Sequence, residues 1–196
     1  MEIQETRAQL EQELQQITKW EKEQNGTSWL DKIGRIPFAV LDRLTPKFIR
    51  DKLGVAINEI GRFIQTGGTY LISPKGIMKR IAKASGQPDV ELKPKDVARL
   101  PLRIMDETAL DLSRSRSNLA AIEGAASGVG GIFTIAADIP AMIGISLKVL
   151  QEIALCYGYY PSDPQERLFI LKCLQFASSD VVGKKAVLQE LANFEQ

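Results

Sequence analysis

Two carboxylates, Glu123 and Asp138, stand at the ends of a glycine-rich stretch that carries no charge from residue 124 to residue 137. If the chain folds back at Gly130-Gly131, the two side chains approach each other. Paired carboxylates can hold a metal ion or transfer protons during catalysis. One hypothesis is therefore an enzyme or a metal-binding protein that uses Glu123 and Asp138.

The same two carboxylates have a structural interpretation, which their surroundings favour. Asp138 shortly precedes Pro140, and an acidic residue before a proline is typical of a helix start. Glu123 has Arg114 and Arg116 nearby as partners for an ion pair. We therefore assign no catalytic residue and no metal ligand, and both carboxylates stay candidates only.

The residue types that are absent restrict the chemistry further. The chain of 196 residues contains no histidine, which excludes histidine-based triads, histidine metal sites and histidine pH switches. Cys156 and Cys173 lie in apolar surroundings, and we expect free thiols in a reducing compartment. The first residues lack the features of a secretory signal. These observations predict a cytoplasmic protein without a cofactor.

The glycine-rich stretch does not fit a nucleotide-binding loop. Gly128-Val129-Gly130-Gly131 resembles part of the dinucleotide fingerprint, but the third glycine would have to stand at position 133, which is Phe133. The residues before it indicate a helix, whereas the fingerprint requires a strand. We therefore expect no bound nucleotide.

The stretch is also too short to cross a bilayer as a helix. Its 14 uncharged residues would span about 21 Å, and a hydrocarbon core is about 30 Å thick. Extension to Leu147 would place Asp138 and Pro140 inside the bilayer, which is unfavourable. A shallow or re-entrant membrane contact stays open on these grounds.

The interpretation that we favour is close helix packing. Gly124, Gly128 and Gly131, with alanines between and around them, are spaced three and four residues apart. Such small residues let a second helix backbone approach closely. The stretch around 124–144 is therefore predicted to form a Gly/Ala-rich hairpin at the centre of the domain.

Helical patterns dominate the rest of the chain, and the best strand candidate, residues 69–73, is short. Asp163-Pro164 is the clearest helix start, and the apolar run that follows predicts a central helix. These patterns predict an all-α fold, a compact helical domain with a central Gly/Ala-rich helical hairpin. The predicted helices cover residues 2–24, 46–64, 74–84, a long segment from 103, 141–157, 163–177 and 181–194, with one turn at most in 87–101.

The net charge of +1 conceals a basic middle segment. Residues 32–103 contain 15 lysines and arginines against 6 acidic residues. A basic helical face can contact anionic lipid, although such charges can also form solvated faces that pair with acidic neighbours. Aromatic residues for base stacking are sparse there, so we do not expect nucleic acid as a partner. The candidate contacts with an anionic surface are Lys75, Lys79, Arg80 and Lys83.

The segment from Ala120 to Leu168, about a quarter of the chain, resembles the EcsC family of bacterial proteins. The resemblance rests on Glu-Gly before a glycine-rich run, on Asp-x-Pro, and on a Tyr-Gly-Tyr turn before an acidic helix start. Tyr160 departs from the family pattern, which often has Asp at this position. The motif residues in this sequence are Glu123, Gly124, Gly128, Gly131, Asp138, Pro140, Tyr157 and Gly158.

The resemblance implies a role beside a membrane system, because the family takes its name from a protein encoded beside the subunits of an ABC exporter. It carries over no catalytic residue. We therefore expect a non-enzymatic accessory factor that associates with an anionic membrane surface or with a membrane-protein complex such as an ABC transporter. Its expected location is cytoplasmic, peripheral at the inner face of the membrane. The expected domains are an N-terminal amphipathic helix (1–26) and an EcsC-like helical domain (27–196).

Overall fold

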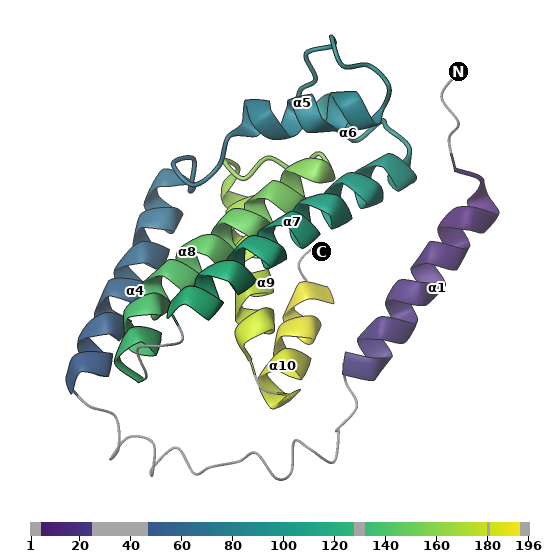
Figure 1. The fold of residues 1–196 in the computed structure, drawn as a ribbon. Coiled ribbons are helices and arrows are strands. Elements are labelled where there is room, and N and C mark those ends of the chain that lie inside the picture. Colours follow the sequence, from purple (N-terminus) through teal and green to yellow (C-terminus); the bar gives the residue numbers. More distant parts are fainter. Residues whose placement is uncertain (1–4, 25–46, 128–131, 180, 193–196) are drawn as a thin grey trace.

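The computed structural model describes residues 5–24, 47–127, 132–179 and 181–192, which form helices and no strand (Figure 1). The all-α prediction is therefore confirmed. The helices are α1 (Arg7–Gln24), α4 (Lys47–Thr66), α5 (Pro74–Ala84), α6 (Pro94–Val97), α7 (Leu102–Ser127), α8 (Ile132–Cys156), α9 (Pro164–Ser178) and α10 (Val181–Ala192).

The two longest helices, α7 and α8, run antiparallel along each other through the middle of the molecule (Figure 1). Helix α4 lies along the other side of α8, while α5 contacts both α7 and α8 across one end of this layer. Helix α9 packs against α8, and α10 packs against α9. The predicted central hairpin therefore corresponds to α7 and α8.

The helix ends follow the signals in the sequence. Ser73 caps α5 by accepting a hydrogen bond from the N–H of Gly76, and Asp163 caps α9 by accepting one from Gln165. A proline stands at the first helical position in both cases, as predicted. The short strand candidate at 69–73 is wrong, because residues 67–71 form a turn after α4.

The predicted helix start at Pro140 is also wrong. Helix α8 begins at Ile132 and continues through Pro140, so Asp138 lies inside the helix and does not cap it. A proline in a helix interior removes one backbone hydrogen bond and costs about 3 kcal/mol. Contacts of α8 with α4, α7 and α9 offset this cost. These contacts are tertiary, so the residues around Pro140 alone could not predict them.

The described core has two apolar clusters near the C-terminal half of α8. The larger one joins α5, α6, α7 and α8, and the smaller one joins α4, α8 and α9. The first contains Ile77, Met78, Ile81, Val97, Met105, Ala109, Leu112, Leu155 and Cys156, and the second contains Phe63, Leu147 and Ile170.

Helix α9 is not central, contrary to the prediction for 163–177. It buries Ile170, whereas Leu168 and Phe169 remain 48% and 41% exposed. The hairpin of α7 and α8 already occupies the middle, so α9 packs from one side. Although α9 is apolar nearly all round, it therefore keeps two large side chains in water.

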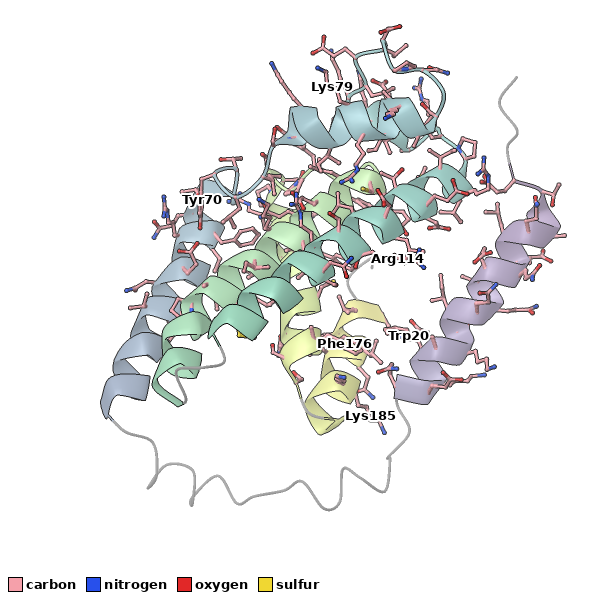
Figure 2. The ribbon with its side chains drawn as sticks, viewed as in Figure 1. Trp20, Tyr70, Lys79, Arg114, Phe176 and Lys185 are labelled. Atoms are coloured by element: carbon pink, nitrogen blue, oxygen red, sulfur yellow. The ribbon has the colours of Figure 1, made fainter. Side chains whose placement is uncertain are left out.

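The C-terminal end of α1 contacts the rest of the chain. Figure 2 shows Trp20 beside Phe176 of α9, with ring centroids 5.6 Å apart. The apolar stripe of this helix, Leu10, Leu14 and Ile17, stays exposed. The division into segments 1–26 and 27–196 stays a prediction.

Among the described residues, no helix combines the length and the apolar character that crossing a bilayer requires.

Candidate functional site

The basic residues predicted to meet an anionic surface lie together on the solvent side of α5. Its apolar positions, including Ile77 and Ile81, are buried against α7 and α8. This separation follows from the three- and four-residue spacing of the two sets. The exposed cationic residues are Lys75, Lys79, Arg80 and Lys83.

One of these four cations is already paired. The guanidinium of Arg80 lies 3.1 Å from a carboxylate oxygen of Asp111 on α7. Lys75, Lys79 and Lys83 form no ion pair with any residue in the described ranges. Arg80 therefore serves partly to hold α5 on α7, while the three lysines keep their charge available for a partner.

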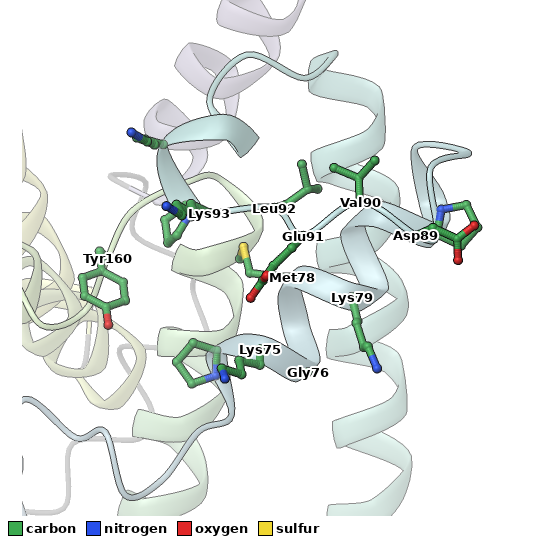
Figure 3. Close-up of a pocket in the computed structure, with 14 residues that line it drawn as sticks. Lys75, Gly76, Met78, Lys79, Asp89, Val90, Glu91, Leu92, Lys93 and Tyr160 are labelled. Atoms are coloured by element: carbon green, nitrogen blue, oxygen red, sulfur yellow. The ribbon is translucent and has the colours of Figure 1, made fainter.

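A groove of about 1120 Å³ runs along the first turns of α5, and sequence reasoning missed it. Its other wall is the proline-bounded segment 88–95, which leads into α6, and Tyr160 closes one side (Figure 3). Its apolar lining includes Met78, Val90 and Leu92. Met78 is buried, whereas Val90 is 47% exposed, so part of the apolar surface remains open to solvent.

The charged side chains that line the groove are mostly cationic. Four lysines face two acidic residues, Asp89 and Glu91. A third acidic residue, Asp96, is engaged elsewhere, because its carboxylate accepts a hydrogen bond from the backbone N–H of Lys93. The lysines are Lys75, Lys79, Lys93 and Lys95.

The Tyr-Gly-Tyr turn positions this end of the bundle. The hydroxyl of Tyr157 donates a hydrogen bond of 2.7 Å to Asp106 on α7. Burial, together with this bond to a carboxylate, raises the pKa of Tyr157 well above its usual value. The phenol therefore stays protonated and joins the end of α8 to α7.

Gly158 ends α8 in a left-handed conformation, with φ of 85°. Its N–H donates to the carbonyl of Leu155, and the next N–H, of Tyr159, donates to the carbonyl of Ala154. This is the Schellman arrangement. A Cβ at Gly158 would lie 2.9 Å from the carbonyl oxygen of Pro94 and 3.0 Å from the N of Ala98. Only glycine lets α6 come this close.

A buried ion pair links the two central helices. Arg116 on α7 donates two hydrogen bonds of 2.9 Å each to the carboxylate oxygens of Glu152 on α8. Glu152 is 2% exposed. The hydrogen bonds to Glu152 raise the pKa of Arg116, so the guanidinium stays charged. Arg116, a predicted partner of Glu123, is thus engaged by Glu152, and Arg114 is exposed without an ion pair to a described residue.

Cys156 lies fully buried one turn from Glu152. Burial, with a smaller contribution from the Glu152 carboxylate, raises the pKa of the Cys156 thiol to about 11. A thiol with so high a pKa is a poor nucleophile at neutral pH, because only the thiolate reacts. Both cysteines are free, as expected, and Cys156 belongs to the core.

The two candidate catalytic carboxylates fall on different helices. Glu123 lies in α7 and Asp138 in α8, but their side chains lie outside the described part of the structure. Whether they meet stays a prediction. In the described ranges, no group of three or more acidic or cysteine side chains is arranged to hold a metal ion.

The glycine positions of the motif have mixed outcomes. Gly124 lies in α7, while Gly128 and Gly131 lie outside the described residues. At Gly144, an added Cβ would meet no atom of the described residues within 4 Å. At this end of the predicted 124–144 stretch, close approach of another backbone is therefore not seen among those residues. At Gly158 of the motif, backbone atoms do come close.

Comparisons with known proteins place the sequence beside one protein family and two curated relatives. The sequence model of the EcsC protein family matches residues 11–196. The uncharacterized protein YdbA of Bacillus subtilis (strain 168) is 48% identical over 192 residues, which cover 98% of this chain and 70% of YdbA. Protein EcsC of the same organism is 30% identical over 126 residues, or 64% of this chain, and the match spans 53% of that protein. No solved structure matches.

Proposed function

The chain belongs to the EcsC protein family, and we propose that it is a non-enzymatic accessory protein that binds an anionic membrane surface through α5. On this proposal it sits at the inner face of the membrane, where it can assist a membrane-protein complex such as an ABC transporter. The observation that carries the proposal is the row of lysines on one exposed helical face, Lys75, Lys79 and Lys83, which form no ion pair with a described residue.

The physical basis is electrostatic. A lysine close to an anionic leaflet contributes about 1 kcal/mol, and the contribution falls off within a Debye length. Three lysines on α5, with Lys93 and Lys95 in the adjoining segment, would together give a useful but reversible affinity. Because α5 is held from behind by its buried apolar face, the lysines can approach a membrane without unfolding of the helix.

The buried ionisable groups support a non-enzymatic role. Glu152 is paired with Arg116, Asp106 accepts the hydrogen bond of Tyr157, and the Cys156 thiol is kept protonated by burial. Each of these groups has a structural partner or an apolar environment, and none faces the groove beside α5.

Vesicle co-sedimentation of the full chain tests the proposal. Phosphatidylcholine vesicles with phosphatidylglycerol should pellet the protein, and vesicles without it should not. The double variant Lys79→Glu/Lys83→Glu loses two favourable contacts and adds two negative charges that the membrane repels, so we expect binding to be at least about 30-fold weaker. Raising the salt from about 0.1 M to about 0.5 M should also release the wild-type protein.

A matched control distinguishes the effect of the α5 face on vesicle binding from the effect of net charge. Lys19→Glu/Lys22→Glu changes the net charge equally, but on α1, where both lysines are also exposed. This control should bind nearly as well as the wild type. An equal loss in both double variants, or binding that ignores lipid charge, would contradict the assignment to α5.

A further inference from the structure

We propose that the groove beside α5 holds one anionic lipid molecule, with its acyl chain on the apolar lining and its phosphate among the lysines. This inference rests on the proposed function, because the membrane supplies the ligand. It goes further, since electrostatic contact with a membrane requires no groove.

The apolar lining is the first observation that points to an acyl chain. Met78, Val90 and Leu92 line the groove; Met78 is buried, Leu92 is half-buried and Val90 is 47% exposed. The volume of about 1120 Å³ is slightly larger than the usual range for ligand pockets, about 300–1,000 Å³. An elongated apolar chain would remove this surface from water.

The charge around the lining selects an anionic headgroup. Lys75 and Lys93 lie toward the same side of the groove as Tyr160, whereas Lys79 and Asp89 lie toward the other (Figure 3). None of the four lining lysines forms an ion pair with a described residue. A phosphate near Lys75, Lys93 and the Tyr160 hydroxyl would gain charge-assisted hydrogen bonds.

The location of the groove fits delivery from a bilayer. Lys79 borders the groove and also projects from the outer face of α5 (Figure 2). A membrane that contacts this face therefore lies next to the groove. A lipid can then enter it without any change in the orientation of the protein.

Isothermal titration calorimetry with alkyl phosphates of six, eight and ten carbons, below their micelle concentrations, tests the inference. Each methylene buried on the lining should strengthen binding about fourfold, so two methylenes give about fifteenfold. Inorganic phosphate should bind far more weakly than decyl phosphate, and decyltrimethylammonium should also bind more weakly. Equal affinity at all chain lengths, or equal binding of the cationic amphiphile, would overturn the inference.

Two variants locate the binding within the groove. Val90→Glu places a carboxylate on the apolar lining, and Tyr160→Asp places one near the lysines, so each should weaken decyl phosphate binding at least tenfold. The matched control is Val55→Glu on α4, because Val55 is 49% exposed and does not line the groove. It should bind as the wild type does. Loss in all three variants, or in none, would contradict a groove site, and circular dichroism checks that each variant is folded.

The two proposals can fail separately. If vesicles pellet the protein but chain length has no effect, the protein adsorbs by charge alone and the groove inference is wrong. Such a result would also favour an acidic protein segment as the occupant. If chain length matters but vesicles do not pellet the protein, the proposed membrane function is wrong, whereas binding of an anionic amphiphile in the groove is supported.

Discussion

Gly158→Ala should destabilise the protein strongly, because two separate costs act at one Cβ. The backbone of Gly158 has φ of 85°, a region that costs alanine about 1–2 kcal/mol relative to glycine. The added Cβ would also lie 2.9 Å from the carbonyl oxygen of Pro94 and 3.0 Å from the N of Ala98. Both neighbours are backbone atoms, so no side chain can rotate away and α6 must move.

The overpacking adds about 1–3 kcal/mol to the conformational cost. The free energy of unfolding should therefore fall by about 2–5 kcal/mol, a large part of the 5–15 kcal/mol that is usual for a domain. For a chain of this size the melting temperature should drop by about 5–15 °C. Urea titration of the full chain, followed by far-UV circular dichroism, measures the change.

Two other glycines separate strain from crowding. Gly86 also has a positive φ, 76°, but its added Cβ meets no described atom within 4 Å, so Gly86→Ala should show only the cost of about 1–2 kcal/mol. Gly54 lies in the exposed interior of α4 with similar open space, and Gly54→Ala should raise stability by up to about 1 kcal/mol. If Gly158→Ala costs no more than Gly86→Ala, the close approach of α6 is refuted.

Two further predictions concern the buried groups between α7 and α8. Arg116→Met leaves the Glu152 carboxylate buried without its partner, so the free energy of unfolding should fall by about 3 kcal/mol. The double variant Arg116→Met/Glu152→Met should recover part of this loss. Urea titration of the wild type and both variants measures the recovery, and a double variant as unstable as Arg116→Met would contradict the prediction. The Cys156 thiol has a folded pKa of about 11 against an ordinary value of 9.0, so its contribution is complete below pH 9 and is lost as the pH rises toward 11, because the unfolded thiol ionises first. Cys156→Ala should flatten this part of the stability profile, and an unchanged slope would show that Cys156 is not its source.

The helices could be predicted from the sequence because their ends are set by local chemistry. Ser73-Pro74 and Asp163-Pro164 each combine a side-chain cap with a proline that is preset for the first turn, and the structure begins helices there. Asp138 and Pro140 gave the same local signal and misled, because α8 packs along its length against other helices and continues through the proline. A cap signal predicts a helix start only where tertiary contacts do not extend the helix across it.

The groove could be predicted only in part. The basic face of α5 follows from residue spacing, but the groove needs residues 88–95 and Tyr160 on the other side. These segments meet through contacts between residues far apart in the sequence, and the periodic pattern within a helix does not predict such contacts. The pairing of Arg116 with Glu152 has the same origin, since 36 positions separate them. The feature of the sequence that could have indicated the groove was the proline-bounded segment 88–95, which contains Lys93 and Lys95.

The Tyr-Gly-Tyr turn, Tyr157 to Tyr159, connects the end of α8 with the groove. Three residues of this short segment have separate roles. The Tyr157 hydroxyl donates a hydrogen bond to Asp106 on α7, Gly158 allows the backbone of α6 to approach closely, and Tyr160 lines the groove. The distance between α6 and the end of α8 therefore sets the position of the groove wall relative to Tyr160. A carboxylate at position 160 would add negative charge where this chain presents a phenol in a groove that four lysines also line. If the groove holds an anion as we propose, Tyr160 is therefore better suited to that ligand than an acidic residue would be, and Tyr160→Asp is the variant that tests it.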